Sequence, residues 1–144
     1  MQATISALQK LLADTYALYL KTQNYHWHVK GPQFKSHHEL FEQQYTELAM
    51  AVDQIAERIL TLGATAPASF SALSALTTIS DGKENLNADQ MLHDLSESHQ
   101  TIIQSMSSIL KTASEHQDEG TVALLSERIA LHEKTLWMLR ASQR

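Results

Sequence analysis

The stretch Asn24–Glu42, NYHWHVKGPQFKSHHELFE, decides the fold because one helical pattern ends in it and another begins. It holds four of the eight histidines in this chain of 144 residues. Gly31-Pro32 ends the first pattern, since glycine is common just past a helix end and proline cannot continue the helix. Ser36, with Glu39 three residues later, has the spacing of a capping box at a helix start. The stretch predicts two helices joined by a tight turn.

Apolar residues at three-to-four spacing predict four long helices. We expect them over about Thr4–Val29, from Ser36 to Leu62, after an Asn87 cap that pairs with Gln90, and after Gly120. The connection 64–86 is long for a bundle, where links of two to eight residues are common, and we expect a short helix around 70–76 in it. The prediction is all-α: a ferritin-like four-helix bundle with one long crossover, forming a single domain over residues 1–144.

Composition excludes several classes of function. The formal net charge of −5 argues against nucleic-acid binding driven by overall charge. The chain has no cysteine, which excludes disulfides, thiolate catalysis and zinc-thiolate sites and fits a cytoplasmic protein. The first twenty residues carry Lys10 and Asp14 inside their apolar pattern, so we expect neither a signal peptide nor a membrane span.

Four potential metal ligands share one side of the second predicted helix. His38 and Glu42 are four residues apart, as are Asp53 and Glu57, and all four fall within an arc of roughly 100°. Glu42 and Asp53 are nevertheless about 16 Å apart along the axis, too far to hold one ion. The four positions are symmetric about a point near residues 47 and 48. A second copy of the helix, packed antiparallel about a two-fold axis there, would complete two equivalent sites.

The tight turn brings His26, at the end of the first helix, towards His38. The expected site then has two imidazoles and three carboxylates, a mixed donor set that suits iron, manganese or zinc. Ordinary roles stay open for each residue, because paired acids on a helix are usually a solvated surface. We interpret His28 and His37 as exposed bystanders. The remaining aromatic and imidazole side chains are expected at the surface, in the core or at an interface: Trp27, His93, His99, His116, His132 and Trp137.

The chain lacks the sequence motif of one kind of di-iron site. Ferritin-like bundles with a di-iron centre inside one subunit carry Glu-x-x-His on two helices, and no Glu in this chain has His three residues later. An intrasubunit di-iron site is therefore not expected, whereas a site between subunits remains open.

The motifs YHWHVKGPQF, HELFE, VDQIAERILTLG and HEKTLWMLR resemble those of the Dps family of mini-ferritins. The motifs cover almost all of the second predicted helix. The predicted arrangement of four helices is also similar to that of the family, and this similarity covers essentially the whole chain. The family's ferroxidase pattern falls on His26, His38, Glu42, Asp53 and Glu57, with Glu42 where Asp is more usual. The longer side chain would shift a second metal position but removes no ligand.

The resemblance implies a homo-dodecameric shell with 23 symmetry and ferroxidase sites at its two-fold interfaces. It implies oxidation of Fe(II), preferentially by hydrogen peroxide, with the iron stored as Fe(III) mineral and cells protected from oxidative damage. Acidic pores at the threefold axes would admit iron, and Asp118 and Glu119 are the candidates here. Two iron ions per site are expected, with zinc or manganese as substitutes.

Several members of the family bind DNA through a basic N-terminal tail. No basic residue precedes Lys10 here, and the last five residues offer two arginines, so we expect weak or absent DNA binding and no firm nucleoid association. The alternatives to a ferroxidase are a non-catalytic metal-binding or DNA-coating shell, and a purely structural helical oligomer.

Overall fold

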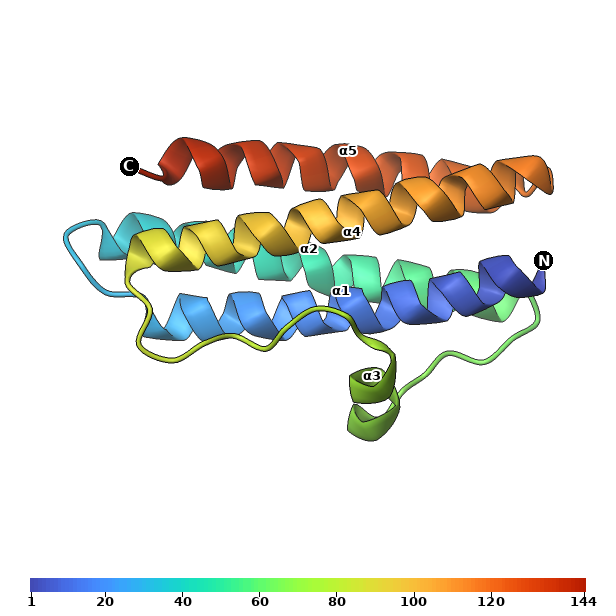
Figure 1. Ribbon diagram of the computed structural model, residues 1–144, viewed down its shortest axis with the longest axis horizontal. Helices are drawn as coiled ribbons and strands as arrows, with labels where there is room; N and C mark the ends of the chain where they lie inside the picture. The colour runs from blue at the N-terminus through green and yellow to red at the C-terminus, as the bar shows by residue number, and fades with distance from the viewer.

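The computed structural model describes residues 1–144 and contains five helices. They are α1 (Gln2–His28), α2 (Phe34–Thr61), α3 (Phe70–Leu76), α4 (Ala88–Glu115) and α5 (Glu119–Ser142). Figure 1 shows the four long helices side by side, with α1 and α2 as one antiparallel pair and α4 and α5 as the other. The all-α bundle and its short crossover helix are confirmed. No helix of the chain combines the length and the hydropathy that a membrane-spanning helix needs.

The predicted apolar stripes form one continuous core. Leu8 from α1, Leu48 and Ile55 from α2, Ile102 from α4 and Leu125 from α5 are each at most 2% exposed. They belong to a single cluster of 19 buried apolar residues. Because every long helix contributes to this cluster, burial of its stripe is what stabilises each helix.

The crossover lies along α1, as Figure 1 shows, and buried polar residues of α1 hold it there. The fully buried carboxylate of Asp14 accepts hydrogen bonds from the hydroxyl of Thr77 (2.8 Å) and the backbone N–H of Thr78 (2.7 Å). Farther along, the Lys21 ammonium donates to Ser80 (3.2 Å) and Ser98 (3.0 Å). These bonds allow the chain to return along the bundle, so that α4 runs parallel to α2.

The capping prediction is right for one helix and wrong for another. Asn87 and Gln90 form the predicted capping box of α4. The box at Ser36 is wrong, because the N-cap of α2 is Gln33, three residues earlier, and the helix begins at Phe34. Gly31, at φ +120°, makes a turn in which the Phe34 N–H donates to the Gly31 carbonyl (3.0 Å). That turn starts the helix early and leaves Ser36 inside its first turn.

Candidate metal centre

The hinge between α1 and α2 holds His26 and His38 face to face. Their ring centroids are 3.8 Å apart and the ring planes differ by 13°. Nδ1 of each ring lies 2.7 Å from the backbone carbonyl oxygen of the other residue. A carbonyl only accepts, so both Nδ1 atoms carry the proton and donate. In the neutral form of each ring the lone pair is then on Nε2, which is the arrangement of a metal-ligating imidazole.

Glu42 adds a carboxylate to this pair. Its Oε1 lies 3.7 Å from Nε2 of His26, and one donor atom from each of His26, His38 and Glu42 lies within 4.8 Å of the others. Metal–ligand bonds to such donors are near 2 Å, so a small closure of the Glu42 side chain would let the three hold one ion. These three residues are three of the five ligands of the predicted site.

Aromatic rings flank the imidazole pair. Phe34 stacks on His38 with centroids 4.9 Å apart, and Tyr45 meets His26 edge-on at 5.1 Å. His26 is 5% exposed, whereas the Glu42 side chain is 59% exposed. The imidazole side of the site is therefore buried in the protein, whereas the side that carries the Glu42 carboxylate is open to solvent.

Asp53 and Glu57 lie apart from the other three ligands. They are on the same helix as Glu42, are exposed, and take part in none of the ion pairs of the chain. Eleven residues of helix separate Glu42 from Asp53, or about 16 Å. The structure thus brings together three of the five predicted ligands and leaves two carboxylates facing outward.

The other two hinge histidines differ from each other. His28 is exposed, and its Nδ1 donates to the carbonyl (2.8 Å) and side-chain oxygen (2.9 Å) of Asn24. His37 is only 8% exposed, so its predicted exposure is wrong, and its Nδ1 has no partner. Neither joins the cluster of His26, His38 and Glu42.

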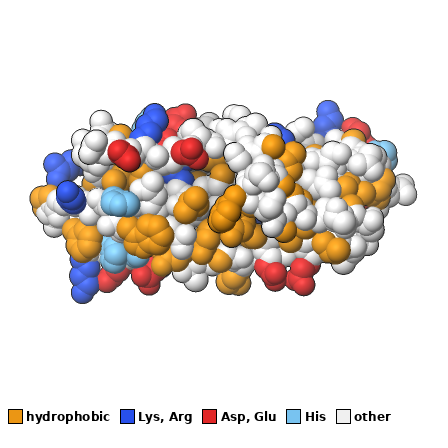
Figure 2. Space-filling view, turned by 90° about the horizontal axis from the view of Figure 1, so that it is seen from below, with side chains coloured by type: hydrophobic (Ala, Val, Ile, Leu, Met, Phe, Trp, Pro, Cys, Tyr) orange, Lys and Arg blue, Asp and Glu red, His pale blue; other side chains and the backbone are white.

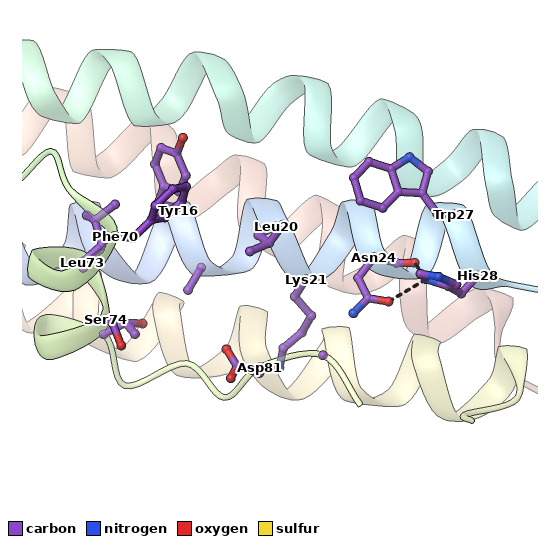
Figure 3. Close-up of a pocket in the computed structure, with 14 residues that line it drawn as sticks. Tyr16, Leu20, Lys21, Asn24, Trp27, His28, Phe70, Leu73, Ser74 and Asp81 are labelled. Atoms are coloured by element: carbon purple, nitrogen blue, oxygen red, sulfur yellow. Dashed lines mark hydrogen bonds between the residues drawn. The ribbon is translucent and has the colours of Figure 1, made fainter. Parts of the chain in front are cut away.

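A groove of about 420 Å³ runs between α1 and the crossover. Figure 3 shows Trp27 and His28 at one end of it and Phe70 and Leu73 of α3 at the other. Trp27 is 59% and Phe70 83% exposed. Figure 2 shows several groups of hydrophobic side chains on this face of the molecule, most of them at its left and middle. An exposed apolar face of this extent is typical of a surface that contacts another protein.

The two pore candidates have different surroundings. Oδ1 of Asp118 caps α5 by accepting from the Thr121 N–H (3.3 Å), and it also accepts from the Arg58 guanidinium (2.7 Å). Burial alone would raise the pKa of Asp118, but these bonds lower it below its usual value. Glu119 is exposed. The exposed carboxylate of Glu119 is therefore the one that an ion can reach. The carboxylate of Asp118 instead links the α4–α5 turn to Arg58 of α2.

A second polar cluster, in the bundle interior, was missed by the sequence analysis. His99 and His132, expected as unrelated residues, lie with their Nδ1 atoms 2.9 Å apart, and Arg128 bridges His132 to Glu47. The sequence does contain a signal for this cluster, because its residues occupy positions within the apolar stripes of two helices. His99 falls between apolar core positions of α4, and Arg128 and His132 fall between those of α5.

Comparisons with known proteins match nearly the whole chain. The ferritin-like domain family matches residues 5–143. DNA protection during starvation protein 2 of Bacillus anthracis is 36% identical, over 95% of this chain and 94% of that protein. A low temperature-induced protein of Nostoc is 37% identical, over 97% of this chain and 79% of its own length.

The solved structures agree with these matches. A Dps protein from Vibrio cholerae, described as a member of a broad superfamily of ferritin-like diiron-carboxylate proteins, superposes with a TM-score of 0.94 at 36% identity. The match covers 97% of this chain and 88% of that one. An antigen of Treponema pallidum superposes with a TM-score of 0.96 at 34% identity, over 99% and 92%. All five candidate ligands fall within residues 5–143, the part of the chain that the ferritin-like domain family matches.

Proposed function

Because this chain belongs to the Dps family of mini-ferritins, we propose that it is a ferroxidase whose sites are shared between subunits. The family indicates iron sequestration and protection under stress. The observation that carries the proposal is the imidazole pair of His26 and His38, whose Nδ1 atoms donate to backbone carbonyls and which lies beside the Glu42 carboxylate. Mixed nitrogen and oxygen donors with open positions suit Fe(II) that is to be oxidised.

The proposal of a site shared between subunits is based on the exposed carboxylates of Asp53 and Glu57. In an antiparallel pair of α2 helices, Asp53 and Glu57 of one subunit would lie beside His38 and Glu42 of the other. The apolar face along α1 and α3 in Figure 2 supports such a contact. Repetition of this contact within a homo-dodecamer is the assembly we propose, in a cytoplasmic protein, with Glu119 the better of the two pore candidates.

Fe(II) and hydrogen peroxide are the proposed substrates. Two Fe(II) ions each give one electron to one peroxide molecule, which yields two Fe(III) ions and two hydroxide ions. His26, His38 and the carboxylates hold the Fe(II), and the Fe(III) product is stored as mineral. Because both electrons reach peroxide at one site, no hydroxyl radical is released.

Anaerobic addition of Fe(II) followed by peroxide tests the proposal. We expect rapid growth of Fe(III) absorbance, with two Fe(II) ions consumed per peroxide and less hydroxyl-radical spin adduct than in a protein-free control. Iron that binds but is oxidised no faster than in the control would instead indicate the alternative, a non-catalytic metal-binding shell.

We predict no DNA retardation at neutral pH and physiological salt. The chain carries a formal net charge of −5, and DNA binding through counterion release needs several clustered cations. An electrophoretic mobility shift with plasmid DNA checks this, with a DNA-binding Dps protein as the positive control. A clear shift by the metal-free protein would contradict the prediction.

A further inference from the structure

The bundle interior holds a second set of metal-type donors around Arg128. The Arg128 side chain is 1% exposed and is the largest fully buried side chain in the chain. Its Nη1 donates to Oε2 of Glu47 on α2 (2.5 Å), and its Nη2 donates to Nε2 of His132 on α5 (2.7 Å). Nδ1 of His132 then meets Nδ1 of His99 on α4 at 2.9 Å. Three helices therefore contribute to one buried cluster.

The hydrogen bonds determine where each proton sits. A guanidinium only donates, so Nε2 of His132 accepts and its Nδ1 carries the proton. That Nδ1 donates to Nδ1 of His99, whose own proton is then on Nε2, an atom with no partner. Burial, more than any other cause, lowers the pKa of both imidazoles, and the charge of Arg128 lowers it further. Both rings are neutral, so Arg128 is the only cation in the cluster.

The two groups that accept hydrogen bonds from the guanidinium are of kinds that bind divalent metal ions. Glu47 offers a carboxylate and His132 an imidazole lone pair. One turn before Glu47, the buried side-chain amide of Gln44 has no partner for either its oxygen or its nitrogen. Bundle proteins build metal sites in their cores from such side chains on facing helices. The Arg128 guanidinium occupies the position between Glu47 and His132 where an ion would bind both.

We propose that Glu47, His132 and Gln44 form a core site for a single divalent cation that prefers imidazole and carboxylate ligands, and that Arg128 fills it. The built-in cation keeps metal ions out of the bundle and confines them to the site at the α1–α2 hinge. The Glu47 side chain is 35% exposed. An ion can therefore reach the three ligands from solvent at Glu47 once Arg128 is absent. This inference is independent of whether the hinge site oxidises iron.

Co²⁺ binding to Arg128→Ala tests the inference. The parent for all variants carries Glu42→Gln, Asp53→Asn and Glu57→Gln, which remove the carboxylates of the hinge site. We expect Arg128→Ala to bind one more Co²⁺ per chain than this parent, with the visible absorption of a low-coordinate Co²⁺. Arg128→Lys keeps the positive charge and is the matched control, for which we expect no extra Co²⁺. Adding Glu47→Gln to Arg128→Ala should abolish the extra binding.

A folded Arg128→Ala protein with no extra Co²⁺ would overturn the inference, and so would equal Co²⁺ binding by Arg128→Lys. If Arg128→Ala fails to fold alone, refolding with and without Co²⁺ replaces the titration, because an ion that binds only the folded state stabilises it. The inference requires that Co²⁺ restore folding, and that it fail to do so when Glu47→Gln is added. Refolding that does not respond to Co²⁺ would contradict it.

Discussion

Replacing Asp53 and Glu57 together with alanine is expected to lower the rate of Fe(II) oxidation by at least about 100-fold, because loss of groups that only orient ligands already costs 10–100-fold. Both side chains are exposed and make no ion pair within the chain. Their removal should therefore leave the stability of the subunit nearly unchanged. Stopped-flow absorbance after addition of peroxide to the Fe(II)-loaded protein measures the effect.

The matched control replaces Gln43 and Gln54 with alanine. These side chains are exposed polar residues of α2, but they lie outside the arc that carries the four ligands of this helix. We expect this double variant to oxidise iron at the parental rate. Parental rates in Asp53→Ala/Glu57→Ala would show that the two carboxylates are not ligands and that the hinge cluster acts alone.

Acidification below pH 6.5 is expected to destabilise the protein through the histidine pair of the core. Burial, with a smaller effect of Arg128, lowers the pKa of His99 from 6.5 to about 3, and it lowers that of His132 in the same direction. Above pH 6.5 both rings are neutral in the folded and the unfolded chain. Below it, the unfolded chain takes up protons that the folded chain cannot, so the free energy of unfolding falls as the pH falls.

The size of the effect follows from the pKa of His99. Each pH unit between 6.5 and the folded pKa costs about 1.4 kcal/mol per imidazole, so His99 alone should cost about 3 kcal/mol at pH 4.5. Urea midpoints at fixed protein concentration from pH 7 to 4.5 measure this. His99→Gln should flatten the dependence, whereas His93→Gln, at an exposed position of the same helix, should not. An unchanged slope in His99→Gln would contradict the account.

The sequence predicted the parts of the fold that depend on neighbours along the chain. Apolar periodicity located the four long helices, and the pairing of Asn87 with Gln90 gave the start of α4. Ser36 was misleading because its spacing to Glu39 is local, whereas the start of α2 depends on the turn at Gly31, a backbone geometry that the residue pattern does not specify.

The metal centre was predictable to a similar extent. The tight turn and helical spacing were enough to predict that His26 approaches His38, which is confirmed. The crossed hydrogen bonds that fix their protonation could not be predicted, because they join side chains to backbone across the hinge. The pairing of His99 with His132 was missed for a similar reason, since it depends on how two distant helices pack.

Mixing two inactive variants tests the shared site most directly. In a dimer of His26→Ala/His38→Ala with Asp53→Ala/Glu57→Ala, one of the two sites receives all five of its parental ligands, and the other keeps only Glu42. Random reassembly of equal amounts should therefore restore about a quarter of the parental sites, and a corresponding share of the Fe(II) oxidation rate. If the reassembled mixture oxidises iron no faster than the two variants assayed separately, the sites are not shared between subunits.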